Sequence, residues 1–356
     1  MLNKPISHIK PNELFQLNGV QYTIDTAKIL ANDFTKTGSE NERNLGEFIL
    51  NWIDDSENIS LITSGTTSEP TTISIPKKAF VNSAKATGVF FNLSSGDSAL
   101  CCLPFSYIAA KMMFVRAWVL GLKLDIIEPS SNPLELISKP YDFLAMVPLQ
   151  IHNSLSKLNQ IGTLLVGGAT VSIDLANQLK QYNCTVFETF GMTETVSHIA
   201  AKNLSEGETV FRVLPNISIA QDDRGCLTVN APHLNPRLLQ TNDVVSLISN
   251  DAFKWLGRLD HVINSGGLKI HPEVLEQKLQ NQIKTPFFIA GVPDEVLGQK
   301  VVLIVEAGAK QLDLDLSDIE TIKRPKATYF LPKFHRTKSG KIQRQKTLDL
   351  LDLNHT

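Results

Sequence analysis

The rest of the chain is organised around the segment Thr185-Val-Phe-Glu-Thr-Phe-Gly-Met-Thr-Glu-Thr195, which continues as Val-Ser-His-Ile-Ala200. Residues 185–190 are largely β-branched and aromatic, which predicts a short buried strand. Gly191 ends this strand, and the turn that follows carries two hydroxyls and a carboxylate. Hydroxyls donate to phosphate oxygens and glutamate is a hard oxygen ligand, so the turn suits a phosphate and its Mg²⁺. The alternative is a strand end capped by Thr193, with Glu194 in solvent.

Strand and helix patterns alternate around this stretch. Strands are expected at 99–103, 122–127, 142–147 and 163–166, and helices at 78–91, 108–120, 149–158 and 173–182. This order predicts an α/β fold with layered, mostly parallel sheets, in which ligands lie beyond the carboxyl ends of the strands. Gly167-Gly168-Ala169 and Gly191-Met-Thr-Glu194 then share one edge. Paired glycines there would let a flat ring approach the backbone, although a simple tight turn explains them equally well.

A second polar loop follows an expected strand at 58–62. Its sequence is Thr63-Ser-Gly-Thr-Thr-Ser-Glu-Pro-Thr71. Backbone N–H and side-chain O–H groups of such a loop can surround a polyphosphate, whereas a flexible Ser/Thr linker is the alternative. No Gly-Lys-Ser/Thr follows, so this is not the Walker phosphate loop. Residues 1–58 are weakly patterned and predict only a short strand-and-helix lead-in.

The pattern changes from Val210 onward. Short strands at 211–219, 225–230 and 244–249, separated by Asp- and Asn-rich turns, predict a small β region, with Asp243 at one turn. A Gly- and Asp-rich joint follows at 257–260, and we expect the domain boundary there. The expected organisation is a large domain over 1–257, a hinge over 258–260 and a smaller α+β domain over 261–356.

Composition excludes several classes of protein. A length of 356 residues predicts about two domains, and a net charge of −2 argues against a surface that binds nucleic acid. Residues 1–16 lack the apolar core of a signal peptide, and no apolar run is long enough to span a membrane. Cys101 and Cys102 are adjacent while Cys184 and Cys226 are isolated, so neither a metal-ligand spacing nor a disulfide framework is present. A reducing cytoplasm is the expected compartment.

The segment from Lys323 to Lys346 is strongly basic. It carries nine Lys or Arg residues and no Asp or Glu, and it includes Arg336-Thr-Lys-Ser-Gly-Lys-Ile342. Tyr329-Phe-Leu-Pro332 interrupts it, which predicts a folded element rather than a disordered arm. A concentrated basic element on a nearly neutral chain indicates a small, phosphate-rich ligand.

Four motifs therefore occur in a fixed order: Thr63–Thr71, Gly191–Thr195, Gly257–Lys269 and Arg336–Lys341. Together they resemble those of the AMP-forming acyl-CoA synthetases, a family of adenylate-forming ligases, over residues 58 to 348. The resemblance implies ATP, Mg²⁺ and coenzyme A as cofactors and co-substrates, and a small carboxylic acid as substrate. A carboxylate would attack the α-phosphate of ATP, giving an acyl-adenylate and pyrophosphate. The thiol of coenzyme A would then displace AMP.

The resemblance also implies roles for individual residues. Contacts to the β- and γ-phosphates of the nucleotide are implied for Ser64, Gly65, Thr66 and Thr67. The residues implied around adenine are Gly167, Gly168, Ala169, Phe190 and Gly191. Asp243 and Arg258 would contact the ribose. Thr193 would contact the α-phosphate and Glu194 would bind Mg²⁺. Lys341 would bridge the acyl carboxylate and the phosphate during adenylation. Lys269, with the Gly266-Gly267 loop, would serve thioester formation, and Asp260 would be the hinge.

Three departures from the family pattern stand out. Ser68-Glu-Pro-Thr71 occupies the place of a Gly-x-Pro-Lys sequence, so Lys77 or Lys78 would have to replace the missing lysine. Asn242 precedes the ribose aspartate in place of glycine, a mild change because asparagine tolerates a left-handed backbone. The chain is also shorter than most members, and we expect the missing length before Thr63.

The short form and the segments 107–116 and 191–200 resemble those members that act on o-succinylbenzoate in menaquinone biosynthesis. The second carboxylate of that substrate needs a cation or hydrogen-bond donors, for which Lys111, Arg116, Ser197 and His198 are available. Lys111 and Arg116 are five residues apart on a helix and do not share a face, and we favour Lys111. A snorkelling surface lysine is the alternative. A ligase for another aryl or fatty acid, and a non-catalytic nucleotide-binding relative, stay open, as does a homo-oligomer.

Overall fold

The structure is a computed structural model that describes residues 10–62, 72–135, 137–308, 312–337 and 341–351. Its α-helices are α1 (Ile24–Thr37), α2 (Glu40–Ile53), α3 (Lys77–Phe90), α4 (Ile108–Leu120), α5 (Pro148–Asn153), α6 (Ile173–Leu179), α7 (Pro272–Leu279) and α8 (Arg344–Leu348). Short 3₁₀ turns are η1 (Leu155–Gln160), η2 (Thr193–Thr195), η3 (Leu259–His261) and η4 (Thr321–Lys323). No helix in these described residues is long and apolar enough to cross a membrane.

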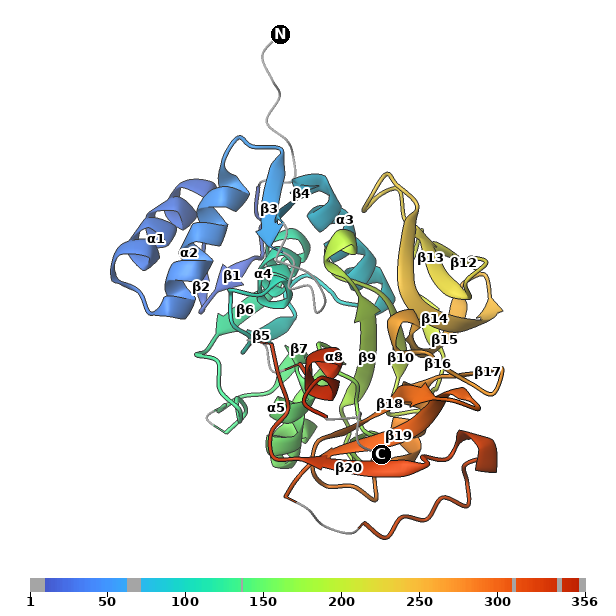
Figure 1. Cartoon of the computed structure of the whole chain (residues 1–356). Helices are drawn as coiled ribbons and strands as arrows, with labels where there is room; N and C mark the ends of the chain where they lie inside the picture. Colours follow the sequence, from blue (N-terminus) through green and yellow to red (C-terminus); the bar gives the residue numbers. More distant parts are fainter. Residues whose placement is uncertain (1–9, 63–71, 136, 309–311, 338–340, 352–356) are drawn as a thin grey trace.

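A parallel sheet forms the centre of the larger part of the molecule (Figure 1). Its strands are β5 (Ser98–Cys101), β6 (Lys123–Ile126), β7 (Tyr141–Met146), β8 (Ile161–Val166) and β9 (Thr185–Gly191), in the order β6-β5-β7-β8-β9. Helices connect most of these strands, as expected for parallel neighbours. The predicted α/β fold class is confirmed.

Both faces of this sheet are buried. Along β8, Leu164 and Val166 pack into a core with α5 and α6, whereas Leu165 packs into a second core with α1 to α4. Successive side chains of a strand point to opposite faces, so a sheet covered on both sides must be apolar at nearly every position. This accounts for the apolar run Leu164–Val166 at the end of β8.

Antiparallel strands extend the same sheet beyond β9. They are β10 (His198–Asn203), β11 (Phe211–Val213), β15 (Ala252–Arg258), β14 (Leu239–Ser249), β13 (Cys226–Asn230) and β12 (Ser218–Gln221), in that order. The sequence predicts a small β region here, and hydrogen bonding makes that region continuous with the main sheet through β10.

The N-terminal segment is more regular than the expected short lead-in. Strands β1 (Gln16–Leu17) and β2 (Val20–Gln21) add to the sheet beside β6, and α1 and α2 follow as two full helices. Each helix begins with a reciprocal cap: Thr23 with Thr26, and Ser39 with Glu42. Ser-x-x-Glu is a capping box that sequence reasoning could have recognised.

The expected strand at 58–62 is present as β3 (Asn58–Ile62), but it lies outside the main sheet. Among the described residues it pairs with β4 (Thr72–Pro76) alone, a strand that was not expected from the sequence. Residues 63–71 connect the two strands and lie outside the described residues. The predicted phosphate contacts Ser64, Gly65, Thr66 and Thr67 are therefore not placed.

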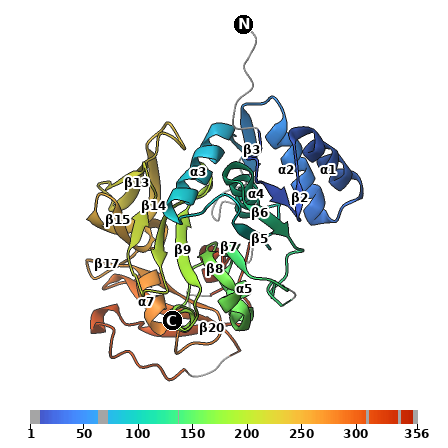
Figure 2. The ribbon, with the colours of Figure 1, turned by 180° about the vertical axis from the view of Figure 1, so that it is seen from behind.

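A second, separate sheet forms after β15. Its strands are β16 (Ile263–Ser265), β17 (Leu268–Ile270), β18 (Phe287–Asp294), β19 (Gly298–Glu306) and β20 (Ala327–Leu331). It lies below the main sheet in Figure 1, and Figure 2 shows α7 beside it from behind. The change from one sheet to the other falls between Arg258 and Ile263, where η3 links β15 to β16.

Candidate functional site

Strands β8 and β9 are parallel neighbours, with Val166 opposite Glu188. Their carboxyl ends therefore lie at one edge of the sheet, and the two turns predicted to hold a nucleotide follow from them. Gly167, Gly168 and Ala169 leave β8, while Met192 to Glu194 leave β9. We call this edge the nucleotide rim. It is where ligands of open α/β sheets are bound.

Two glycines of the rim are fixed by close packing. A Cβ atom on Gly167 would lie 2.8 Å from Thr189 Oγ1, and one on Gly191 would lie 2.5 Å from His198 Cα. The Gly191 contact is with backbone, so glycine is required at 191 whether or not a ligand binds, whereas a side chain at 167 would have to displace the Thr189 hydroxyl. Gly168 is different, because its φ of 82° is left-handed while a Cβ atom there would make only an ordinary contact with Val147 Cγ1 at 3.5 Å.

The side chains of Thr193 and Glu194 have no hydrogen-bond partner within the described part of the chain. Thr195, by contrast, is buried and its hydroxyl donates to the carbonyls of Met192 and Ser197, both at 2.9 Å. The carbonyl of Glu194 accepts from Asn235 Nδ2 at 3.2 Å, which holds its backbone while the carboxylate is exposed. The hydrogen bonds of Thr195 therefore hold the turn in place, and the oxygen-bearing side chains of Thr193 and Glu194 are available to a ligand.

This donor set fits Mg²⁺ rather than a metal caged by protein. Among the residues that the structure describes, no three His, Cys, Asp or Glu side chains come together as a metal site. Mg²⁺ usually keeps several waters and is held by one or two carboxylates together with substrate phosphates. Glu194 is the residue that would hold it, and the bound ion would offset phosphate charge.

Phe190 lies at the end of β9 and is half-buried. Its ring packs edge-on against Phe253 at 5.2 Å between centroids, and it is tilted against Phe211 at 5.9 Å. Aromatic neighbours at this spacing hold the ring in one orientation. A predicted stack on adenine would use the part of the ring that these neighbours leave open.

Asp243 and Arg258 lie opposite each other on β14 and β15. Trp255 Nε1 donates to Asp243 Oδ1 at 2.9 Å, and Arg258 Nε donates to Asp260 Oδ1 at 3.1 Å. Burial raises the pKa of Asp243, against the opposing effects of the Trp255 hydrogen bond and the charge of Arg258. Burial also acts on Asp260, but the hydrogen bond and charge of Arg258 bring its pKa below the ordinary value. Sequence reasoning missed Trp255, although its place in the hairpin after Asp243 could have indicated it.

The joint between the two sheets is packed in this structure. Gly257 has a φ of 144°, and a Cβ atom there would collide with the carboxylate of Glu273 on α7. His261 Nδ1 lies 2.5 Å from Glu273 Oε1, and Arg344 Nη2 lies 3.7 Å from the same oxygen. A rotation of the second sheet about residues 258–260 would have to change the close approach of Gly257 to Glu273, whereas His261, Glu273 and Arg344 all follow the joint and would move together.

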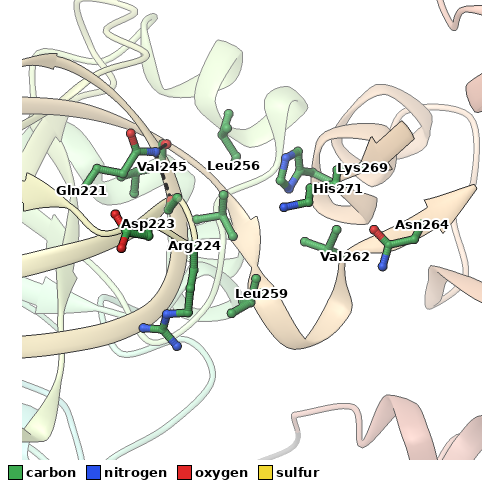
Figure 3. A pocket seen from close by; sticks show the side chains of 12 residues that line it. Gln221, Asp223, Arg224, Val245, Leu256, Leu259, Val262, Asn264, Lys269 and His271 are labelled. Atoms are coloured by element: carbon green, nitrogen blue, oxygen red, sulfur yellow. Dashed lines mark hydrogen bonds between the residues drawn. The ribbon is translucent and has the colours of Figure 1, made fainter. Parts of the chain in front are cut away.

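Gly266 and Gly267 form the turn between β16 and β17, with φ values of 56° and 81°. Two consecutive left-handed residues are typical of a tight hairpin. Lys269 is exposed on β17 and lines a cavity of about 560 Å³ between the two sheets. In Figure 3, Lys269 and His271 face Gln221, Asp223 and Arg224 across this cavity.

The C-terminal segment that carries Lys341 is folded. Arg336 forms a two-pronged ion pair with Glu306, and Arg344 forms another with Glu276. The backbone N–H of Thr337 donates to the Lys341 carbonyl at 2.8 Å, and Arg336 bridges to Ile342. The Lys341 side chain is exposed, with no hydrogen bond or ion pair to another described residue.

The structure separates the residues proposed for the second carboxylate. Arg116 Nη2 donates to Ser197 Oγ at 2.6 Å and lies 3.4 Å from His198 Nδ1. Lys111 lies elsewhere, 5.8 Å above the Phe48 ring, where burial lowers its pKa. Arg116, rather than the favoured Lys111, is therefore the cation beside Ser197 and His198.

Lys77 does not offer a free replacement for the missing loop lysine. It is fully buried, and its Nζ donates to Asp54 Oδ1 at 2.7 Å and to the Asp54 carbonyl at 2.8 Å. Lys78 is exposed and stays available. The buried pair ties the start of α3 to the end of α2, beside the β3–β4 hairpin.

Comparison with known proteins identifies the family of the chain. The model of the AMP-binding enzyme family matches residues 14–231, more than half of the sequence. The chain belongs to the AMP-binding enzyme family. Among the relatives is the 2-succinylbenzoate–CoA ligase of Enterococcus faecalis, 25% identical over 330 residues that cover 80% of this chain and 68% of that protein.

Two solved structures extend the comparison. A protein of Dyadobacter fermentans, described as an acyl-CoA synthetase (AMP-forming)/AMP-acid ligase II-like protein, is 34% identical with a TM-score of 0.60. That match covers 90% of this chain and 97% of the other, so it again places the chain in the family. O-succinylbenzoate coenzyme A synthetase of Bacillus subtilis, in complex with ATP and magnesium ion, is 19% identical with a TM-score of 0.70. The match covers 82% of this chain and 69% of the Bacillus subtilis chain, and it shows that the two proteins share a fold.

Proposed function

We propose that this protein is an AMP-forming acid–CoA ligase whose substrate is o-succinylbenzoate. The observation that carries the proposal is the nucleotide rim. It brings Gly167-Gly168-Ala169 beside Thr193 and Glu194 in a chain of the AMP-binding enzyme family. Both polar side chains are free for a ligand, and they are the types that phosphate and Mg²⁺ require.

The first half-reaction joins the acid to AMP. A carboxylate oxygen attacks the α-phosphorus of ATP, a new P–O bond forms, and the bond to the bridging oxygen breaks so that pyrophosphate leaves with its electron pair. Negative charge increases around the α-phosphorus on the way. Fixed donors stabilise such charge most strongly in a site that excludes water. Thr193 would donate its hydroxyl to the α-phosphate, and Lys341 would bring an ammonium group between phosphate and carboxylate.

Asp243 and Arg258 are proposed to hold the ribose. Each carboxylate oxygen can accept a hydroxyl proton in a hydrogen bond, and Trp255 already donates to one of the two oxygens of Asp243. That bond fixes the carboxylate plane before the nucleotide arrives. Arg258 is turned toward Asp260 in this structure, so its contact with ATP would require a change in the η3 segment.

The second half-reaction transfers the acyl group. The thiol sulfur of coenzyme A attacks the acyl carbon, the C–O bond to AMP breaks, and the thiol proton goes to solvent. The Gly266-Gly267 turn and Lys269 are proposed to approach the rim for this step. Because Lys341 and Lys269 lie at opposite ends of the second sheet's sequence, we propose that 261–356 rotates about Asp260 between the two half-reactions.

The choice of o-succinylbenzoate draws on two kinds of support. The relative from Enterococcus faecalis carries the name 2-succinylbenzoate–CoA ligase. In addition, the rings of Phe90, Phe91 and Phe187 contact one another edge-on. His198, which lies beside the buried Arg116, packs against Phe91 at 5.6 Å between ring centroids. An aromatic acid with a second carboxylate suits aromatic side chains next to a cation. The cytoplasm is the proposed compartment, consistent with four buried, free cysteines.

The test is pyrophosphate release by the purified full chain with ATP, Mg²⁺ and a panel of acids. The panel holds o-succinylbenzoate, benzoate and a medium-chain fatty acid. The proposal expects release with o-succinylbenzoate well above the other two. Release only with the fatty acid or benzoate would support a ligase for another acid. No release with any acid, alongside measurable ATP binding, would support a non-catalytic relative.

A further inference from the structure

We infer that Asn235 is a positioning residue for the adenylation step and that it acts through Glu194. The inference rests on the proposed function and deepens it. Asn235 lies in the segment Ala231-Pro-His-Leu-Asn-Pro-Arg237, which links β13 to β14. Its Nδ2 donates to the Glu194 carbonyl at 3.2 Å, although the two residues are 41 positions apart in the sequence. The 231–237 segment therefore contacts the turn that carries the proposed Mg²⁺ ligand.

The side-chain amide of Asn235 has one orientation that fits its surroundings. Its Oδ1 accepts the backbone N–H of Arg237 at 3.0 Å, a contact that an NH₂ group could not make. The Nδ2 end then points the other way, toward Glu194. Pro236 restricts the backbone of Asn235 to extended conformations, and the Asn235 N–H donates to the Ala231 carbonyl at 2.9 Å. The donor is therefore held in place before any ligand arrives.

The 231–237 segment is itself anchored beside α3. Leu234 is 4% exposed and belongs to a core cluster that includes Ala86 of α3 and Ile199 of β10. Asn82 Nδ2, also on α3, donates to the His233 carbonyl at 2.8 Å. Figures 1 and 2 both show α3 between β3 and the strands β13 and β14. The segment thus connects a helix that is packed in the core to the exposed turn at the nucleotide rim.

The turn that carries Glu194 is followed by a strained backbone conformation. Val196 has φ 68° and ψ −44°, and the Ser197 N–H donates to the Thr195 carbonyl at 2.7 Å. This is the rare, strained form of the γ-turn, and a positive φ is unusual for a β-branched residue. Such a conformation persists only where surrounding contacts determine it. Thr195 makes such contacts within the turn, and Asn235 makes one from another segment.

A fixed carbonyl at Glu194 also fixes where its carboxylate and the neighbouring Thr193 hydroxyl can reach. Mg²⁺ demands near-ideal octahedral geometry, so a displaced carboxylate would hold the ion less well. Groups that are fixed in advance also stabilise charge as it develops at the α-phosphorus. Thioester formation begins after pyrophosphate has left. We therefore expect adenylation to depend on Asn235 far more than thioester formation does.

The test measures each half-reaction in single turnovers of the full chain. Asn235→Ala should slow acyl-adenylate formation roughly 10-fold and move the Mg²⁺ titration of ATP binding to higher concentration. Thioester formation from supplied acyl-adenylate should change less than about twofold. Asn82→Ala, which loosens the segment at its contact with α3, should show a smaller slowing of the same step. It applies the same criteria if Asn235→Ala fails to fold.

A double mutant tests whether Asn235 acts through Glu194. Once Glu194→Gln has weakened the metal ligand, adding Asn235→Ala should slow adenylation little further, because the two changes affect one interaction. Asn32→Ala on α1 is the matched control, since it removes an amide that donates to the Lys28 carbonyl at 2.7 Å, outside the 231–237 segment and the nucleotide rim. This control should leave both half-reactions unchanged.

Three results would overturn the inference. Equal slowing of both half-reactions would make the 231–237 segment a purely structural element. Full additivity with Glu194→Gln would mean that Asn235 acts elsewhere, and wild-type adenylation in both Asn235→Ala and Asn82→Ala would remove the positioning role while the ligase activity stands. If the wild-type chain binds ATP with Mg²⁺ but forms no acyl-adenylate, the proposed function fails. The Mg²⁺ titration of ATP binding then still decides whether Asn235 positions Glu194.

Discussion

Trp255 Nε1 donates a 2.9 Å hydrogen bond to Asp243 Oδ1 across the β14–β15 hairpin, at the residue proposed to hold the ribose. Removing this donor leaves a buried carboxylate with one partner fewer. We expect Trp255→Phe to raise KM for ATP roughly 10-fold with little change in kcat, because the loss falls on ground-state binding. Trp52→Phe is the matched control, since the indole N–H of this buried tryptophan has no hydrogen-bond partner in the described part of the chain. If Trp255→Phe left the KM for ATP unchanged, the proposed role of Asp243 in holding the ribose would be contradicted.

Glu194 is an exposed carboxylate on a turn whose backbone is held by Asn235. Glu194→Gln should therefore alter the side chain alone. We expect the Mg²⁺ titration to shift to higher concentration and kcat to fall, because an amide is a weaker ligand than a carboxylate for a hard cation. Glu206→Gln, at another exposed glutamate, should leave the titration in place. An unshifted curve for Glu194→Gln would mean that this residue only faces solvent.

Glu306 accepts two hydrogen bonds from Arg336 and one from the Phe334 N–H at 2.6 Å, anchoring the segment that leads to Lys341. The Arg336 hydrogen bond, acting against burial, lowers the pKa of Glu306 from 4.5 to about 2. A depressed carboxyl pKa stabilises the folded state above the unfolded value, and this contribution is lost as pH falls. The Tm difference between wild type and Glu306→Gln should thus be constant near neutral pH and shrink from about pH 4.5 toward about pH 2. A Tm difference between the two proteins that does not change with pH would contradict the lowered pKa of Glu306.

Lys341 is exposed, and its side chain has no partner among the described residues. Lys341→Ala should therefore fold normally. We expect it to abolish acyl-adenylate formation while leaving thioester formation from supplied acyl-adenylate largely intact. Lys346→Ala, which removes another cation of the same segment, should retain both steps. Comparable loss of both half-reactions in Lys341→Ala would exclude the role proposed for this lysine.

The proposed hinge can be tested at Asp260, inside the 3₁₀ turn Leu259–His261. Proline fixes φ near the value that a 3₁₀ turn already has, so Asp260→Pro should favour the present orientation of the second sheet. One half-reaction should then slow far more than the other in single-turnover measurements. Asp260→Ala removes the Arg258 contact but leaves the backbone free, so the difference between the two variants isolates the hinge. If Asp260→Pro carried out both half-reactions at wild-type rates, the proposed hinge and the proposed domain boundary at 258–260 would both be wrong.

Local patterns were sufficient for the parallel part of the fold. The predicted helix over 108–120 coincides with α4, and the predicted strand over 185–190 lies within β9, because each has a strong pattern and a glycine at or just past its end. Strand β4, Thr-Ile-Ser-Ile-Pro, was missed although its threonine and isoleucines favour a strand, because it is only five residues long and its conformation is fixed by pairing with β3. The regularity of α1 and α2 was missed because their caps were not considered.

The site was less accessible to sequence reasoning for a physical reason. Helical spacing indicates that Lys111 and Arg116 face different directions, but it does not say which direction meets β10. Helix α4 is buried on nearly every side, so the cation nearer its apolar centre is the one that reaches Ser197. Contacts across the sheet, such as Trp255 with Asp243, depend on register between distant strands and follow only from the fold.

The most direct test of the account is product formation from o-succinylbenzoate, ATP, Mg²⁺ and coenzyme A, followed by mass spectrometry. We predict o-succinylbenzoyl-CoA and AMP in equal amounts, with both products absent when Lys341→Ala replaces the wild-type chain. ADP in place of AMP, or no thioester while benzoate or a fatty acid is converted, would contradict it.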